Sequence, residues 1–516
     1  MFQKVKQSIS TLAIKEVKPK VLLSGIIITV FVAFLPLFII AIYNHPCADD
    51  FTYGYYPHAF FSTTGSLLET LKWNFFQVKT TYETWQGTFT SAFFMGLSPA
   101  VFSEKIYFLS PIIMFTMIIS STIFILKVLL VELLKADKIS YGIISAITVF
   151  IIIEQMHWPA QGIYWYNASI HYTFMHSAML FLLGNAICFL LFNEKNKRIK
   201  ALVWSVFMAF LCSGSNYVTA LTGILLTALV CLLGIFIQKK KALFLILPLG
   251  VYLLGFYFNV TAYGNQVRQA YYEKQTPVLA ILNSFIAGVR RIDGWFSYLL
   301  LLLLILLIPI IWNMVSKIKF QFSYPVLVTL LSFGIISAMF TPSFYALNSE
   351  GLARALNITK MLFQLLLILN EIYWIGWIVK KLEAKQFSIV LPHYYYFYGF
   401  LAMLMLLIFY TSVNREGEYI SYGAYASLVT GQAKTYHEEY LERLEVLKDE
   451  DNLNPVLKPF TQKPFLLYVD DIIEDPMDWR NMAMSNWYRK ERLRKEQRAP
   501  GSTILGTLYY SKRELI

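Results

Sequence analysis

Charged residues and cysteines are scarce in this sequence, and each scarcity excludes a class of protein. Asp, Glu, Lys and Arg together make up 15% of the 516 residues, whereas hydrophobic residues make up 57%. A water-soluble chain of this length cannot bury so large an apolar fraction. The four cysteines form no CxxC pair, so neither a disulfide framework nor a zinc site is supported. No Walker lysine motif is present, which argues against ATP-driven transport within this chain.

Positive charge is in excess, and the net charge is +12. Most of the Lys and Arg residues stand in short loops between apolar runs, which is the positive-inside pattern of membrane proteins. Membrane topology therefore explains the sign of the charge, and we expect contact with membrane lipids and no nucleic-acid partner.

Apolar runs of membrane-spanning length are abundant. A span needs roughly 20 apolar residues, because each helical residue rises about 1.5 Å and the hydrocarbon core is about 30 Å thick. The sequence therefore predicts an all-α polytopic membrane protein with about eleven transmembrane helices. The predicted spans are 21–43, 107–134, 140–156, 173–192, 200–214, 217–237, 242–260, 295–314, 323–341, 356–379 and 388–411. One alternative stays open for 200–237, a broken span that divides near 213–216.

The basic loops predict the orientation of the chain. With the N-terminus inside, every short inner loop carries lysine, whereas the outer loops 157–172 and 212–217 contain neither Lys nor Arg. This orientation predicts a multi-pass protein of the bacterial plasma membrane. Its parts are a cytoplasmic N-terminal segment (1–20), a transmembrane domain (21–411, with a long outer loop at 44–106) and an extracytoplasmic C-terminal region (412–516).

Two segments outside the predicted spans have their own patterns. Counting 85–102 as a span would invert every later loop, and glycines interrupt the run, so 60–102 is predicted to form interfacial or re-entrant helices. The C-terminal region is predicted to be α(+β). Its elements are an amphipathic helix over 436–450, a short strand over 465–469, a solvated acidic turn over 470–478 and a basic helix over 479–495.

Carboxylates in the long outer loop are the candidate catalytic groups. Asp49 and Asp50 follow the first span, and Glu83 lies near the end of the same loop. A carboxylate at a membrane edge is well placed to act as a general base or to hold a divalent cation. The alternative interpretation is a polar pair that ends the first span in water.

Aromatic and amide side chains are the candidate sugar-binding or acceptor-binding groups, since aromatic faces stack on sugar C–H surfaces and amides bond to hydroxyls. These residues are Trp85, Tyr164, Trp165, Tyr166, Asn167 and His171. The same composition also suits an aromatic belt at the membrane interface, and the residues alone do not separate the two interpretations.

Arginines distinguish the outer loops from the lysine-rich inner loops. The outer arginines are Arg268, Arg290, Arg291 and Arg354. Arginine binds phosphate oxygens bidentately, whereas lysine does not, so these residues are candidates for binding a lipid phosphate. The alternative is ordinary lipid contact or an ion pair with Glu350 or Asp293.

Together these motifs resemble the GT-C superfamily of membrane glycosyltransferases that use polyprenyl-phosphate sugars. The resemblance rests on Asp49-Asp50 after the first span, the Trp85-x-Gly87 tract, the aromatic tract 164–169 and Arg354 before a late span, and it covers most of residues 20–410. It implies a GT-C-like fold in which Asp49 or Asp50 activates the acceptor hydroxyl and Arg354 stabilises the phosphate leaving group. Many relatives carry Arg directly after the glycine, where this chain has Thr88. That departure leaves Arg268, Arg290 or Arg291 to take the role.

We therefore expect an outer-face glycosyltransferase that moves a sugar from a polyprenyl-phosphate donor to a cell-surface glycan, polymer or lipid acceptor. No cofactor is implied with certainty, and a divalent cation, Mg²⁺ or Mn²⁺, stays open because the relatives differ. One alternative is a flippase or transporter of lipid-linked glycan, which would use the same arginines without an outer base. Another is a polysaccharide polymerase or ligase with a glycan-lipid donor.

Overall fold

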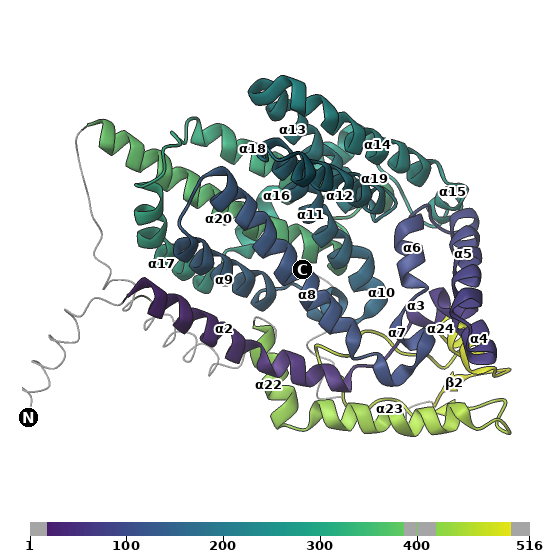
Figure 1. Ribbon diagram of the computed structural model, residues 1–516. Helices are drawn as coiled ribbons and strands as arrows, with labels where there is room; N and C mark the ends of the chain where they lie inside the picture. Colours follow the sequence, from purple (N-terminus) through teal and green to yellow (C-terminus); the bar gives the residue numbers. More distant parts are fainter. Residues whose placement is uncertain (1–17, 386–398, 400–418, 497–516) are drawn as a thin grey trace, which may run out of the picture.

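The computed structural model, which describes residues 18–385, 399 and 419–496, is mostly helical (Figure 1). The long helices are α2 (Pro19–Ile40), α5 (Leu67–Thr84), α8 (Leu109–Leu126), α9 (Lys138–Glu154), α11 (Met175–Leu191), α12 (Lys195–Ser213), α13 (Tyr217–Ala242), α14 (Ile246–Thr261), α16 (Pro277–Trp295), α17 (Tyr298–Val315), α18 (Pro325–Ala338) and α20 (Ala353–Ala384). The short helices between them are η1 (Ala41–Tyr43), α3 (Asp49–Tyr53), α4 (Tyr55–Thr64), α6 (Phe89–Met95), α7 (Pro99–Phe102), η2 (Glu104–Ile106), η3 (Lys127–Leu133), η4 (Ala160–Tyr164), α10 (Tyr166–Ser169), η5 (Ile170–Phe174), η6 (Leu243–Leu245), α15 (Tyr263–Gln269) and α19 (Thr341–Leu347). The C-terminal region contains α22 (Ile420–Val429), α23 (Gln432–Lys448), β1 (Val456–Leu457), α24 (Trp479–Tyr488) and β2 (Arg494–Lys495).

Seven helical stretches in the described residues are long and apolar enough to cross a membrane. They are Pro19–Tyr43, Glu104–Leu133, Tyr166–Leu191, Tyr217–Thr261, Tyr298–Val315, Pro325–Leu347 and Ala353–Ala384. The architecture is therefore that of an all-α polytopic membrane protein. The count of about eleven spans and the GT-C-like fold stay predictions.

Five of the predicted spans do not correspond one-to-one to the seven stretches. The spans 140–156 and 200–214 form helices, α9 and α12, and α12 begins with a charged turn. The spans 217–237 and 242–260 fall within one stretch that is bent at Gln238 and η6. The helices α12 and α13 separate at 214–216, where the sequence predicted a break, and the number of spans that they make stays a prediction. The predicted span 388–411 lies outside the described residues.

The helix α5 has an inverted amphipathic pattern. Its buried face carries polar side chains at helical spacing, whereas Leu68 is 75% exposed and Phe75 is 62% exposed. The buried polar residues are Thr70, Asn74, Gln77 and Thr81. A helix that turns its apolar face outward fits a lipid environment and not water. The segment 85–102 is divided into α6 and α7, so it is not a single span.

The predicted outer loop 157–172 does not extend away from the bundle. It folds back as η4, α10 and η5, and nearly all residues between 159 and 173 are buried. Both η4 and η5 are π-helical turns, which are rare in proteins and frequent at functional sites. The loop is thus part of the protein core.

The described C-terminal residues pack against the bundle at the C-terminal end of α2. Here α22 contacts α2, α23 contacts η1, and α24 lies against α3 and α4 (Figure 1). The strands β1 and β2 form a short parallel pair in which Val456 is opposite Arg494. This region covers the loop that carries Asp49 and Asp50.

The structure confirms some of the elements predicted for the C-terminal region and contradicts others. The amphipathic helix over 436–450 is confirmed as α23. The strand over 465–469 is wrong, because the amides of Leu467 and Tyr468 both donate to the carbonyl of Pro464 and close a turn. The basic helix that begins at Trp479 ends at Tyr488 and not at 495, since Arg489 adopts a left-handed conformation with φ of 58°.

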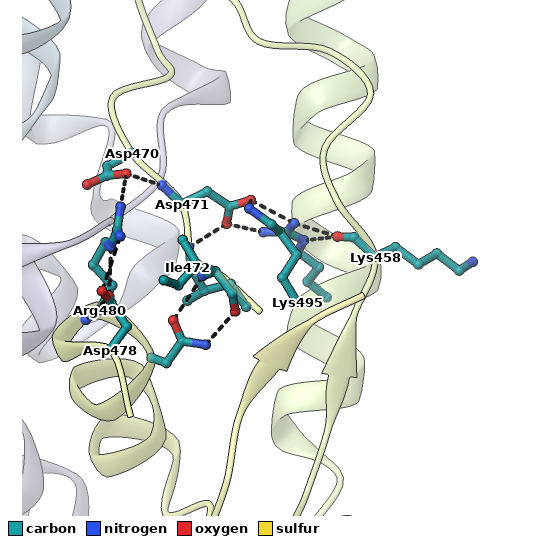
Figure 2. A network of polar contacts seen from close by, with 10 residues as sticks. Lys458, Asp470, Asp471, Ile472, Asp478, Arg480 and Lys495 are labelled. Carbon is teal, nitrogen blue, oxygen red and sulfur yellow. Dashed lines mark hydrogen bonds and ion pairs between the residues drawn. The ribbon is translucent and has the colours of Figure 1, made fainter. Parts of the chain in front are cut away.

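The predicted solvated acidic turn is also wrong for three of its five carboxylates. Arg443 donates to Asp471 at 2.8 and 3.2 Å, and the side chains of this pair are only 7% and 6% exposed. Arg480 bridges Asp470 and Asp478 at 2.9 and 2.8 Å (Figure 2). The remaining two, Glu474 and Asp475, are exposed. Arginines distant in the sequence therefore convert an acidic run into internal ion pairs.

The Arg443–Asp471 pair should stabilise the C-terminal region strongly. We expect Asp471→Asn to destabilise this region by about 3 kcal/mol, because breaking a buried pair leaves an uncompensated charge. Hydrogen exchange of α23 would report the loss of protection. The matched control is Glu438→Gln, since the Lys434–Glu438 pair is 69% and 58% exposed and should contribute little. Equal protection in the two variants would contradict the expectation.

Candidate functional site

A short helix holds the two neighbouring carboxylates in different environments. The helix α3 begins at Asp49, and Ala48 before it has φ of 48° and ψ of −118°, a strained conformation for a residue with a side chain. Asp50 is fully buried, and its carboxylate accepts four hydrogen bonds. The donors are Tyr107 Oη at 2.5 Å, Asn167 Nδ2 at 2.6 Å, Asn167 N at 3.2 Å and Cys47 N at 3.0 Å.

Asp50 is therefore an anchor for the surrounding segments. Its donors come from the loop before α3, from the residues before α8 and from α10. Burial raises the pKa of Asp50 to about 6, although the hydrogen bonds from Tyr107, Cys47 and Asn167 oppose the rise. Since its acceptor positions are filled, Asp50 is poorly placed to take a proton from a substrate.

Asp49 has the opposite character. Within the described part of the chain, its carboxylate accepts no hydrogen bond. Burial raises the pKa of Asp49, the guanidinium groups of Arg354 and Arg268 oppose the rise, and Asp470 adds to it. Asp49 is thus a carboxylate that two arginines approach and that no protein donor occupies.

Arg354 stands at an electrostatically unfavourable place in its helix. It is the second residue of α20, where the helix dipole favours negative charge and disfavours arginine. Its guanidinium lies 5.6 Å from the ring centre of Trp165 and 5.9 Å from that of Tyr172. Among the described residues it forms no hydrogen bond or ion pair. The guanidinium and the start of α20 together make a place that attracts an anion.

Arg268 reaches the Trp85-x-Gly87 tract from α15. It donates to Gln86 Oε1 at 2.5 Å and lies 5.3 Å from the ring centre of Trp85. Gln86 in turn donates from Nε2 to the hydroxyl of Tyr53 at 2.9 Å. Since Tyr53 is one helical turn after Asp49, this chain of contacts links Arg268 to the helix that carries Asp49.

Gly87 is required for this contact between α15 and the tract. A Cβ atom at Gly87 would lie 1.9 Å from the backbone oxygen of Asn259 in α14. The amide of Gly87 also donates to Asn265 Oδ1 at 2.9 Å. The glycine therefore permits the close approach that brings Arg268 to Gln86.

A cavity of about 430 Å³ begins beside these groups. Its polar end includes Gln86, Thr88, His171 and Arg268. Most of the remaining wall is apolar and comes from α13, α14, α16 and α19. Its apolar residues include Val218, Leu221, Phe256, Val260, Ile281 and Leu347. A cavity of this composition suits an amphiphile whose anionic head lies near Arg268.

Five of the six predicted sugar-binding residues do not line this cavity, and one of the five, Trp85, lies beside Arg268. The hydroxyl of Tyr164 donates to Leu37 O at 2.9 Å, and that of Tyr166 donates to Phe94 O at 3.0 Å. Asn167 is bound to Asp50. Trp165 is buried beneath Arg354, and its Nε1 donates to Cys47 O at 3.2 Å. Of the six predicted residues, His171 lines the cavity.

Three other predicted site residues lie apart from Asp49. Glu83 is 57% exposed and pairs with Lys79 at 3.9 Å. Arg290 and Arg291 both form ion pairs with Glu350, which is the alternative that the sequence left open. The structure thus brings Arg268 and Arg354 to Asp49 and leaves these three residues in local pairs.

The site also contains three residues that the sequence did not predict: Tyr53, Gln86 and Tyr107. The spacing of four between Asp49 and Tyr53 would have placed them on one helix face. No comparable pattern indicates Tyr107, because its contact with Asp50 is tertiary.

In residues 18–385, 399 and 419–496, no group of three or more His, Cys, Asp or Glu side chains is arranged to hold a metal ion. A divalent cation therefore stays an untested prediction.

Comparison with known proteins adds no family, because no family model, curated protein or solved structure matches this chain. The chemistry of the site is therefore the basis for any functional conclusion.

Asp50 and Asp49 should differ in their effect on stability. We expect Asp50→Asn to lower the free energy of unfolding by about 3 kcal/mol, because an amide NH₂ would face donors in a buried site. Asp49→Asn should change it by less than about 1 kcal/mol, since no hydrogen bond is lost. Thermal unfolding of the purified protein in detergent would measure both. A similar loss in both variants would show that Asp49 is structural as well.

Gly87 and Gly250 make a second matched pair. We expect Gly87→Ala to destabilise the protein by about 1–3 kcal/mol, because the methyl group forces the tract away from α14. Gly250, within α14, has no heavy atom within 4 Å of a Cβ position. Gly250→Ala should be neutral or stabilising by up to about 1 kcal/mol through helix propensity. Tolerance of Ala at Gly87 would refute the close approach.

Proposed function

We propose that this protein is a membrane glycosyltransferase that moves a sugar from a polyprenyl-phosphate donor to a cell-surface glycan, polymer or lipid. One observation carries the proposal. Asp49 has no hydrogen-bond partner among the described residues, and Arg354 and Arg268 act on it electrostatically. Of these groups, Arg268 lines a largely apolar cavity. A base next to an anion site and an apolar cavity is the arrangement that a lipid-phosphate sugar requires.

In the proposed reaction Asp49 is the general base. It accepts the proton of an acceptor hydroxyl while that oxygen attacks the anomeric carbon of the donor sugar. The bond from the anomeric carbon to the phosphate oxygen breaks, and its electron pair stays on the lipid phosphate. Negative charge grows on the phosphate at this step, where Arg268 and Arg354 stabilise it. The attack occurs opposite the leaving group, so the anomeric configuration inverts.

The cavity supports the lipid part of the donor. Apolar side chains from four helices line it, and burying an isoprenoid chain there releases water from apolar surface. Arg268 stands at the polar end, so the phosphate meets a cation while the chain lies among Leu221, Phe256 and Ile281. This separation of head and tail matches an amphiphile and not a free sugar phosphate.

The proposed location is the outer side of a bacterial plasma membrane, with the N-terminus cytoplasmic. The support is the distribution of lysines. The helix α20 begins next to Arg354 and carries Lys380 and Lys381 near its other end, about 40 Å away along the helix axis. Lys239, Lys240 and Lys241 likewise follow at the end of α13 that is distant from Asn216 and the cavity. The positive-inside rule then assigns the site to the outer side.

Surface-glycan analysis of a deletion strain tests the proposal. Wild-type protein should restore one missing sugar, whereas Asp49→Asn should reduce transfer by roughly 10²- to 10⁴-fold at an unchanged membrane level. Arg268→Gln and Arg354→Gln should each reduce it by roughly 10²- to 10³-fold. Glu69→Gln, an exposed carboxylate on α5, is the matched control and should restore fully.

Each contrary outcome identifies a different function. If Asp49→Asn restores the sugar while the arginine variants fail, the protein moves lipid-linked glycan without catalysing transfer, as a flippase would. If the missing component is polymer length and not one sugar, the chemistry belongs to a polymerase or ligase. If no surface sugar changes in the deletion strain, the glycosyltransferase proposal is wrong.

A further inference from the structure

Several polar side chains at the cavity end are occupied by protein partners. Asn216 donates to His171 O at 2.6 Å and accepts from Thr219 N at 2.9 Å. The hydroxyl of Tyr217 donates to Asn265 Oδ1 at 2.6 Å, and Asn265 donates to Asn259 O at 2.6 Å. These groups hold the wall together and have little capacity left for a ligand.

Thr88 is an exception with an identifiable cause. It is the N-cap residue of α6, a position where a threonine hydroxyl ordinarily accepts from the first free amides of the helix. Here the amides of Thr90 and Ser91 donate instead to the carbonyl of Gly214, at 3.1 and 3.3 Å. Thr88 lines the cavity and is only 1% exposed. Its buried hydroxyl has no hydrogen-bond partner in the described structure.

His171 is the second exception. This residue lines the same cavity and is 8% exposed. Nδ1 has no hydrogen-bond partner among the described residues. The charges of Arg354 and Arg268 both act on the imidazole, so the ring lies near both proposed phosphate ligands. A neutral imidazole offers one donor and one acceptor.

Buried polar groups without partners are costly, by roughly 1–3 kcal/mol each, and a native protein retains them where a ligand or water completes them. Gln86 lines the same cavity as Thr88 and His171, and it is bonded to Arg268 and Tyr53. The two unpartnered groups therefore lie near Arg268, a proposed phosphate ligand. A hydroxyl and an imidazole match the hydroxyl groups of a sugar, whereas the arginines match the phosphate.

We propose that Thr88 and His171 form a subsite for the hydroxyl groups of the sugar that is attached to the lipid phosphate. The inference rests on the proposed function and adds to it the residues that recognise the sugar itself. The subsite lies within the protein, at the junction of α6 and η5, and not on the exposed aromatic surface that a sugar-binding loop would present.

Lipid binding by the full-length protein in nanodiscs tests the subsite. The probes are polyprenyl phosphate without a sugar and the same lipid carrying one glucose, galactose or mannose. Wild type should prefer at least one of the glycosylated lipids. Thr88→Val and His171→Phe should each weaken its binding by roughly three- to tenfold and leave the bare lipid unchanged. Arg268→Gln should weaken both lipids.

A matched control removes a buried hydroxyl elsewhere. Thr148 in α9 is fully buried and donates to Ile144 O at 2.7 Å, so Thr148→Val should preserve both affinities. Unchanged binding in Thr88→Val and His171→Phe would mean that these groups bind only buried water and would overturn the subsite. So would equal weakening of both lipids, which indicates a phosphate or folding role.

The wild-type measurements separate the two proposals. If wild type binds bare and glycosylated lipids equally, the subsite fails while the lipid-phosphate site stands. If wild type binds none of these lipids, the proposed function fails together with the subsite.

Discussion

The buried carboxylate of Asp50 is the interaction on which the site depends. Its four hydrogen bonds join the loop after α2, the residues before α8 and the helical turn α10. Tyr107 extends the network, because its hydroxyl also accepts from the amide of Tyr166 at 3.0 Å. A charged group is stable in such a place only when donors surround it. Once Asp50 is held in this way, the first residue of α3, Asp49, points to a place where no donor of the described protein occupies it.

The rest of the site is assembled around that fixed point by helices from distant parts of the sequence. The start of α20 contributes Arg354, and α15 contributes Arg268 through its contact with Gln86. Neither contact is possible without close packing, since Gly87 must approach the backbone of α14 and Trp165 must lie beneath Arg354. The C-terminal region adds a cover on the same end, and its Asp470 acts electrostatically on Asp49. The cavity then extends from the charged groups into an apolar space between helices.

Local properties of the chain are what the sequence could predict. Apolar runs predicted most of the long helices to within a few residues, and the glycines in 60–102 indicated that 85–102 is not one continuous helix. The strand over 465–469 was wrong because one carbonyl, that of Pro464, closes a turn against the local β-propensity. The prediction of a solvated acidic run over 470–478 is wrong for Asp470, Asp471 and Asp478 because their arginine partners, Arg443 and Arg480, lie outside the run. Each error arises where a contact outside the window decides the conformation.

The sequence by itself determined that this is a membrane protein, because hydrophobicity and loop charge are sums over neighbouring residues. It also identified Asp49, Asp50 and the four arginines of the predicted outer loops as candidates. Only the tertiary structure decided among them. Adjacent aspartates are indistinguishable by composition, yet one is saturated with donors and the other is free of them. Arg290 and Arg291 are paired with Glu350, whereas Arg268 and Arg354 act electrostatically on Asp49. Burial, pairing and proximity depend on residues hundreds of positions apart, and no local pattern encodes them.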